Sequence, residues 1–136
     1  MSVEKEQHEA QRWLQQARAD LRAAESSIAA EVFEWACFQS QQAAEKALKA
    51  FWFHHSADPW GHSLLKLIED FPDDELRGAV TPLLAQAKAL DKLDIPTRYP
   101  NGLPDSIPAE VYTEPEARSA IESAGQVIEA VAAAIG

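Results

Sequence analysis

The sequence predicts an all-α fold, an up-and-down bundle of about five helices built on a long antiparallel helix hairpin. The 136 residues include only five glycines, and Ala-rich segments with apolar residues at helical spacing cover most of the chain. The prolines gather mainly in one stretch, so they break the helical pattern there and leave the long segments uninterrupted. This length suits one compact unit, and we treat residues 1–136 as a single domain.

The central helix is predicted most firmly, over Phe33–Phe53 with an extent of about 31–55. This stretch contains neither Gly nor Pro, and Ala, Leu, Glu, Gln and Lys all favour a helix. A buried stripe at helical spacing is expected on one side. The stripe comprises Phe33, Ala36, Cys37, Ala44, Ala47, Leu48 and Phe51. A polar flank of Gln42, Glu45, Lys46 and Lys49 is expected beside it, and Glu45 can pair with Lys49 four residues later.

A first long helix over residues 5–30 supplies the other half of the hairpin. Its apolar side runs from Trp13 and Leu14 to Ile28. A last helix should begin after Thr113, because a Thr followed by Glu114, Pro115 and Glu116 has the composition of a helix start. This helix should run to Ile135 and pack alongside the hairpin.

Shorter helices are expected between the second and the last long helix. The segment HSLLKLIEDF starts at His62, and Pro72-Asp73-Asp74 ends it and starts the next helix. Thr81 should cap a helix whose first residue is Pro82 and which runs to about Leu93. The stretch Ile95–Tyr112 carries four prolines and a glycine, so we expect it to be a long non-helical loop.

The composition limits the classes of function. A formal net charge of −10 disfavours broad electrostatic capture of nucleic acid, although a few focused cations can still hold a nucleotide or a short RNA. The acidic surplus from Asp105 onward would also suit a basic partner protein. No apolar run is long enough to span a bilayer and no secretion signal is evident, so we expect a cytoplasmic protein without membrane contact. The single Cys37 is expected to be a buried core residue.

Three motifs, in order, carry a resemblance to a known family. They are the run ACFQSQQAAEKALKAF in the central helix, the segment His62–Leu65 (HSLL) and the turn Arg98–Asn101 (RYPN). Together they resemble HEPN domains (higher eukaryotes and prokaryotes nucleotide-binding), from about Ala17 to the C-terminus. The resemblance is closest to the small prokaryotic type that is often encoded beside a minimal nucleotidyltransferase.

That resemblance implies a function and partners. It implies a homodimer that acts as a nucleotide- or RNA-associated partner module of a minimal nucleotidyltransferase, in a pair of the toxin–antitoxin kind. The working surface would be the polar flank of the central helix together with the loop Ile95–Tyr112. Its residues would be Gln42, Glu45, Lys46, Lys49, Arg98 and Tyr99. No cofactor and no metal are expected, because the adjacent His54 and His55 point in different directions on a helix and His62 lacks carboxylate or Cys partners at metal-site spacing.

Many HEPN proteins are metal-independent ribonucleases in which four to six residues separate an Arg from a following His. Here Arg98 is followed at those distances by Leu103, Pro104 and Asp105. The motif is therefore absent, and the sequence leans away from an enzyme. Two alternatives stay open. One is a ribonuclease toxin in which Arg98 works with His62 or with residues of a partner subunit, and the other is a purely structural dimeric interaction protein.

Arg98 itself admits two roles that are compatible. Its planar fork of donors suits a phosphate or a carboxylate, and Tyr99 beside it could stack on a base. Alternatively, Arg98 pairs with Asp91, Asp94 or Glu45 and pins the loop to the bundle.

Overall fold

The computed structural model describes residues 2–136, and this part of the chain is helical with no strand. Seven α-helices and two 3₁₀ turns follow in order. They are α1 (Val3–Ala29), α2 (Phe33–His54), α3 (Leu64–Glu69), α4 (Asp74–Arg77), η1 (Thr81–Leu83), α5 (Leu84–Asp91), η2 (Pro100–Gly102), α6 (Pro108–Val111) and α7 (Glu114–Ile135). The predicted all-α fold is confirmed. The single-turn α4 begins where Pro72-Asp73-Asp74 predicted a helix start, and α6 is a helix that the sequence did not predict.

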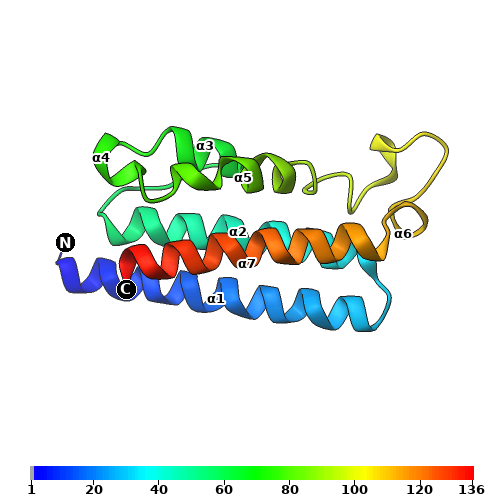
Figure 1. Cartoon of the computed structure of the whole chain (residues 1–136), viewed down its shortest axis with the longest axis horizontal. Coiled ribbons are helices and arrows are strands. Elements are labelled where there is room, and N and C mark those ends of the chain that lie inside the picture. Colours follow the sequence, from blue (N-terminus) through cyan, green and yellow to red (C-terminus); the bar gives the residue numbers. More distant parts are fainter. Residues whose placement is uncertain (1) are drawn as a thin grey trace.

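The three long helices form one layer of the bundle. Figure 1 shows α1, α2 and α7 side by side, with α1 and α2 antiparallel. A tight turn joins the hairpin, and Glu31 in that turn adopts a left-handed conformation with φ of 61°. The predicted antiparallel hairpin with the last helix packed alongside is therefore confirmed.

The side chains at the helix starts explain where α1 and α7 begin. The Ser2 hydroxyl accepts a hydrogen bond from the backbone N–H of Lys5, which satisfies one of the free donors at the start of α1. Thr113 and Glu116 form a reciprocal capping box at the start of α7. Both starts lie close to the predicted positions.

The core lies where α2 meets α1 and α7, and small residues let the three helices approach closely. Ala17, Ala36, Ala44 and Ala124 are completely buried. Larger side chains fill the remaining space, with Phe51 and others from α2, α3 and α7. Burial of an apolar side chain of this kind contributes about 1.5–3 kcal/mol, and the same core continues into the short helices through residues such as Leu64 and Leu90.

The short helices α3, α4 and α5 form a second layer over α2 (Figure 1). The helix expected from His62 begins two residues later, because Ser63 is its cap and accepts from the backbone N–H of Lys66. The expected cap at Thr81 was wrong, because its hydroxyl already donates to the carbonyl of Arg77. Residues Thr81–Leu83 instead form a 3₁₀ turn that leads into α5.

The expectation of a wholly non-helical loop over Ile95–Tyr112 was only partly right. Pro100 opens the 3₁₀ turn η2, and Pro108 opens the single-turn helix α6. Proline suits the first position of a helical turn because its missing N–H would have no partner there. The loop thus carries two short helical turns and ends against the start of α2, at the right of Figure 1.

Within residues 2–136, none of the helices combines the length and the apolar character that a membrane span requires.

Candidate functional site

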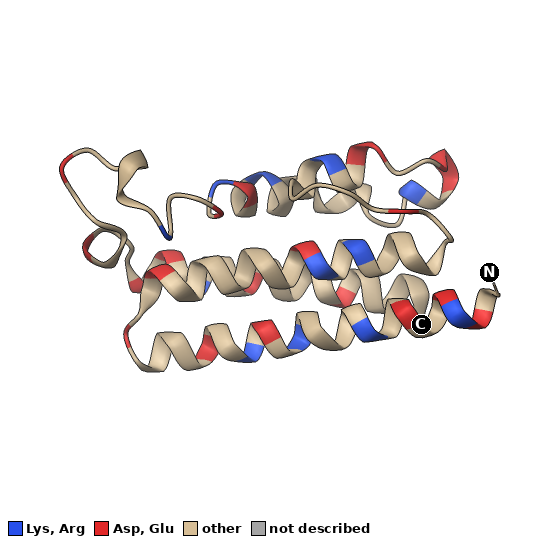
Figure 2. Cartoon of the chain, turned by 180° about the vertical axis from the view of Figure 1, so that it is seen from behind, with Lys and Arg blue, Asp and Glu red and all other residues tan. Residues whose placement is uncertain are grey.

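One side of α2 gathers most of the polar residues that the sequence singled out. Phe38, Gln42, Glu45 and Lys49 are spaced by four, three and four residues, which places them along one face of a helix. Seen from behind, as in Figure 2, α2 carries charged residues toward the viewer, and the loop after α5 dips down toward it. We call this surface the α2 face, and it has two halves around Arg98 and around Glu45.

Arg98 lies flat against the beginning of the α2 face. Its guanidinium carbon is 4.3 Å from the ring centroid of Phe38 and 5.2 Å from that of Tyr99. Its Nε donates to the backbone carbonyl of Asp94 at 3.1 Å, and its Nη2 donates to Asp94 Oδ1 at 3.0 Å. Of the three acids expected to pair with it, Asp94 is therefore the partner.

This arrangement leaves part of the guanidinium open. A guanidinium has five N–H donors, and Asp94 engages two of them. Among residues 2–136 no other hydrogen bond from the Arg98 guanidinium is found, and the side chain is 28% exposed. Tyr99 next to it is 50% exposed. Arg98 and Tyr99 thus present free donors and an open aromatic ring at one place.

Glu45 occupies the other half of the α2 face and is buried, which corrects the expectation of a solvated polar flank. The residue is only 5% exposed, and its Oε2 accepts from Lys49 Nζ at 3.1 Å. His62 Nδ1 lies 3.3 Å from the same oxygen. The expected Glu45–Lys49 pair is present, but the connector that carries His62 covers it.

His62 lies before α3 with its side chain 76% exposed. Its ring nitrogen Nδ1 faces Glu45, which leaves Nε2 as the nitrogen with no protein partner in the described part of the chain. No contact between His62 and Arg98 is found among residues 2–136. The structure therefore brings His62 together with Glu45 and not with Arg98.

The remaining residues of the polar flank, Lys46 and Gln42, are bonded to other side chains of the protein. Lys46 Nζ lies 2.6 Å from Asp20 Oδ2 on α1, and Gln42 donates to the side-chain carbonyl of Gln41 at 2.8 Å. Lys49 also lies 5.9 Å from the ring centroid of Trp13. Both lysines thus have a carboxylate partner: the sequence predicted Glu45 for Lys49 but gave no partner for Lys46.

Asp91 has a structural role at the start of α3. Its carboxylate accepts from Ser63 Oγ at 2.9 Å and from the backbone N–H groups of Leu64 and Leu65 at 2.7 and 3.0 Å. These are the free donors of a helix N-terminus, which a carboxylate satisfies well. Asp91 therefore joins α5 to α3 and is not a partner of Arg98.

Sequence reasoning missed Phe38 as part of the site. Phe38 is half-buried, and its ring supports both the Arg98 guanidinium and, edge-on at 5.8 Å, the ring of Trp35. The signal was present, because Phe38 lies four residues before Gln42 on the polar face and not on the apolar stripe. An aromatic residue on the polar side of an amphipathic helix is a feature that can mark a binding surface.

The other candidate reactive residues, His55 and Cys37, pack among apolar side chains. His55 packs against the rings of Phe51 and Phe71 at 4.8 and 5.8 Å, and this burial lowers the pKa of its imidazole. Burial likewise raises the pKa of the Cys37 thiol to about 12, and the nearby Glu116 adds to the shift. No group of three or more potential ligands for a metal ion is found within the described residues.

Comparisons with known proteins agree with the architecture and the motifs. Residues 10–134 match the HEPN domain family. The crystal structure of TT1696 from Thermus thermophilus shares 41% sequence identity, with a TM-score of 0.85 over 92% of this chain and 97% of that one. ST0689, an archaeal HEPN homologue, shares 32% identity, with a TM-score of 0.77 over 93% and 98% of the two chains.

A third similar structure is the HEPN domain protein tm0613 from Thermotoga maritima. It shares 29% identity, with a TM-score of 0.66 over 90% of this chain and 95% of that one. The comparison with curated proteins found no match. The family match covers nearly the whole chain, the solved relatives have the same helical arrangement, and the chain belongs to the HEPN domain family.

Proposed function

We propose that this HEPN protein is a nucleotide- or RNA-associated module that binds through the Arg98 half of the α2 face. The observation that carries the proposal is the stack of Phe38, Arg98 and Tyr99, in which a guanidinium keeps free donors beside an exposed ring. A phosphate would accept from Arg98, since Arg is well suited to phosphate oxygens. A base would stack on Tyr99, a contact worth about 1–3 kcal/mol.

The overall charge makes this a focused site and not a long nucleic-acid track. With a net charge of −10, the protein would repel most of an extended phosphate backbone. Lys46 and Lys49 are paired with Asp20 and Glu45, so they add little free positive charge. The ligand class is therefore a single nucleotide or one or two residues of single-stranded RNA.

A ribonuclease is the second candidate, because of the contact between His62 and Glu45. A carboxylate that holds Nδ1 of an imidazole leaves Nε2 free to act as a general base or acid. Such a residue could act on the ribose 2′-hydroxyl of an RNA that reaches from Arg98 along the α2 face. The lack of contact between His62 and Arg98 ranks this activity below binding alone.

The test measures binding and cleavage on the same samples. A dye-labelled single-stranded RNA and a labelled nucleotide are titrated with the protein without metal, and the RNA is then analysed for cleavage. Arg98→Ala should weaken binding by at least about tenfold, since charge-assisted hydrogen bonds contribute about 1.5–3 kcal/mol. Lys88→Ala, which removes an exposed cation of α5, is the matched control and should bind like the original protein.

The outcomes separate the candidates. Binding that Arg98→Ala and Lys88→Ala weaken equally, or that does not occur, would contradict the proposal. Cleavage that Arg98→Ala or His62→Ala abolishes would establish the ribonuclease instead. Intact RNA, together with a dimer in sedimentation and no binding, would favour the purely structural role.

The pairing with a minimal nucleotidyltransferase is the other part of the proposal, and it is supported by the sequence resemblance. Under this proposal the chain is a homodimer and one member of a toxin–antitoxin pair. Co-expression of this protein with a nucleotidyltransferase encoded beside it should yield a complex in gel filtration. Growth arrest on expression of either member alone, relieved by the other, would identify the toxin.

A further inference from the structure

Exposed large hydrophobic side chains concentrate at one end of the bundle. Eight such residues are found in the described part of the chain. Five of them come from the start of α2, the loop after α5 and α6. They are Trp35, Ile95, Tyr99, Ile107 and Val111. We call the surface formed by residues 31–38 and 94–118 the loop end, and it is the right-hand end of Figure 1.

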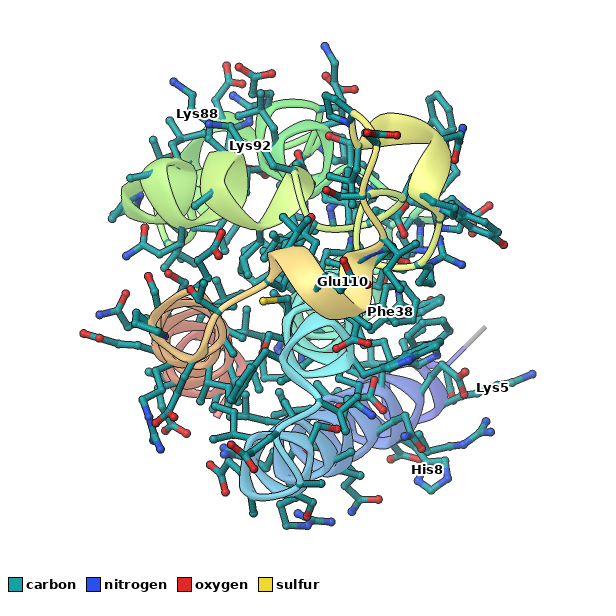
Figure 3. All side chains as sticks on the ribbon, turned by 90° about the vertical axis from the view of Figure 1, so that its right-hand side faces the viewer. Lys5, His8, Phe38, Lys88, Lys92 and Glu110 are labelled. Carbon is teal, nitrogen blue, oxygen red and sulfur yellow. The ribbon has the colours of Figure 1, made fainter. Side chains whose placement is uncertain are left out.

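The loop end is supported by the contacts of α6 and Tyr112 with α2 and the core. α6 packs against α2, with Pro108 buried and Tyr112 packed partly buried on the core. Ile107 and Val111, one turn apart, stay 46% and 38% exposed on the outer side. Figure 3 looks onto this end, with α6 in front of α2 and with Glu110 and Phe38 labelled there. The exposed residues are thus presented by an ordered support.

The same end carries a strong excess of carboxylates. Residues 31–38 and 94–118 hold seven acids and two cations. The acids are Glu31, Glu34, Asp94, Asp105, Glu110, Glu114 and Glu116. The two cations, Arg98 and Arg118, are each bonded to one of these acids. Within residues 2–136 the other five carboxylates have no cation within salt-bridge distance, so this end of the bundle combines exposed apolar side chains with uncompensated negative charge.

We propose that the loop end is a docking surface for a partner protein with an apolar centre and a basic rim. Trp35 and the aliphatic pair of α6 would be the anchors, because buried aromatic and apolar anchors dominate such interfaces. The carboxylates would meet lysines and arginines at the rim and steer the encounter. This surface goes beyond the proposed function: it includes Arg98 and Tyr99, but its anchors Trp35, Ile107 and Val111 are other residues.

Charge decides against the other occupants. An extended nucleic acid or an anionic lipid surface would face five carboxylates that have no cation partner, whereas the site proposed at Arg98 takes only one or two nucleotides. A second copy related by a two-fold axis would bring the same surplus of carboxylates against this one, and like charges across an interface oppose association. A basic protein surface is the occupant that satisfies both the apolar side chains and the charge.

The test uses a dye-labelled synthetic helix in which Leu and Lys alternate at amphipathic spacing, and a matched helix with Glu in place of Lys. The original protein should bind the Lys helix and not the Glu helix, and added salt should weaken this binding. The triple variant Trp35→Ser/Ile107→Ser/Val111→Ser should bind the Lys helix at least about tenfold more weakly, as expected for the loss of interface anchors. The control triple Val3→Ser/Trp60→Ser/Leu76→Ser removes the other three exposed hydrophobics and should change nothing.

A variant that changes only the charge keeps the proposal testable if the triple variant does not fold. Glu34→Gln/Glu110→Gln keeps the size of both side chains and should weaken binding of the Lys helix several-fold and reduce its salt dependence. Equal losses in the two triple variants, binding of the Glu helix, or no binding of the Lys helix would overturn the proposal. A dimer that becomes a monomer in the loop-end triple variant would also overturn it and assign this surface to a second copy. RNA binding should not weaken in Glu34→Gln/Glu110→Gln or in the control triple variant, because both keep Phe38, Arg98, Tyr99 and the Trp35 ring that packs on Phe38. The two proposals therefore fail separately.

Discussion

The two halves of the α2 face both place a cation near an aromatic ring, but they differ in what remains free. Lys49 lies 5.9 Å from Trp13 and is 12% exposed, with Glu45 as a counter-ion that is itself 6% exposed in its side chain. Arg98 lies 4.3 Å from Phe38 and is 28% exposed, with Asp94 similarly exposed. The first half is closed over its ion pair, and the second is open to solvent.

A cation near a surface is available to a ligand only if some of its donors are free and also reach the solvent. Lys49 has three donors on a point charge and a buried carboxylate beside it. Arg98 has five donors in a planar fork, and the single acid Asp94 with its backbone carbonyl uses two. We therefore expect the closed half to control stability and the open half to control binding.

The largest effect should follow removal of the carboxylate in the closed half. Glu45→Ala leaves Lys49 largely buried without its counter-ion, and breaking a buried pair from one side costs about 3–5 kcal/mol. The free energy of unfolding, measured by urea denaturation, should fall by about 3 kcal/mol or more. Glu45→Gln keeps the shape and should cost less.

A double variant separates the ion pair from the packing around it. Glu45→Leu/Lys49→Met replaces both charges with apolar groups, and such replacements of buried pairs are often neutral or stabilising. It should therefore recover most of the stability that Glu45→Ala loses. A double variant as unstable as Glu45→Ala would show that the carboxylate has a role beyond its pairing with Lys49, such as holding His62.

A smaller effect should follow removal of the cation that joins α1 and α2. Lys46→Ala breaks the partly exposed pair with Asp20, which should lower the free energy of unfolding by about 1 kcal/mol or less. RNA affinity should change by less than about twofold, since this lysine is already paired. A loss of affinity as large as that of Arg98→Ala would contradict the conclusion that only the open half controls binding.

Helix periodicity was sufficient to predict the scaffold. The stripe from Phe33 to Phe51 and the start signal at Thr113 placed the long helices within a few residues, because these features are local. The short helices were less predictable. Thr81 is of a residue type that often caps a helix, but its hydroxyl donates to the Arg77 carbonyl. No local sequence pattern predicts this hydrogen bond.

The candidate site was predictable in its members and less so in their partners. Spacing placed Glu45 and Lys49 on one face, but their burial depends on the connector around His62, which folds back from a distant part of the sequence. The stacking of Arg98 on Phe38 joins residues sixty positions apart in the numbering. Contacts of that range arise from tertiary packing, which one sequence does not encode in a readable pattern.

The smallest expected effect concerns pH and the C-terminal end of α2. Burial, and then the charge of His54, lower the pKa of His55 below its ordinary value of 6.5, while Asp73 acts in the opposite direction. The unfolded chain therefore takes up a proton on this residue at a higher pH than the folded chain does. Stability from the neutral ring is fully present above pH 6.5 and declines as the pH falls through 6.5 toward the lowered value.

Chemical denaturation at about pH 7.5 and at successively lower pH values should show this decline. His55→Phe keeps an aromatic ring against Phe51 and Phe71 and cannot be protonated, so its stability should fall less steeply over the same range. His54→Gln, which removes only the second cause of the shift, is the control and should keep most of the slope. Equal slopes for the original protein and His55→Phe would show that groups other than His55 set the acid sensitivity.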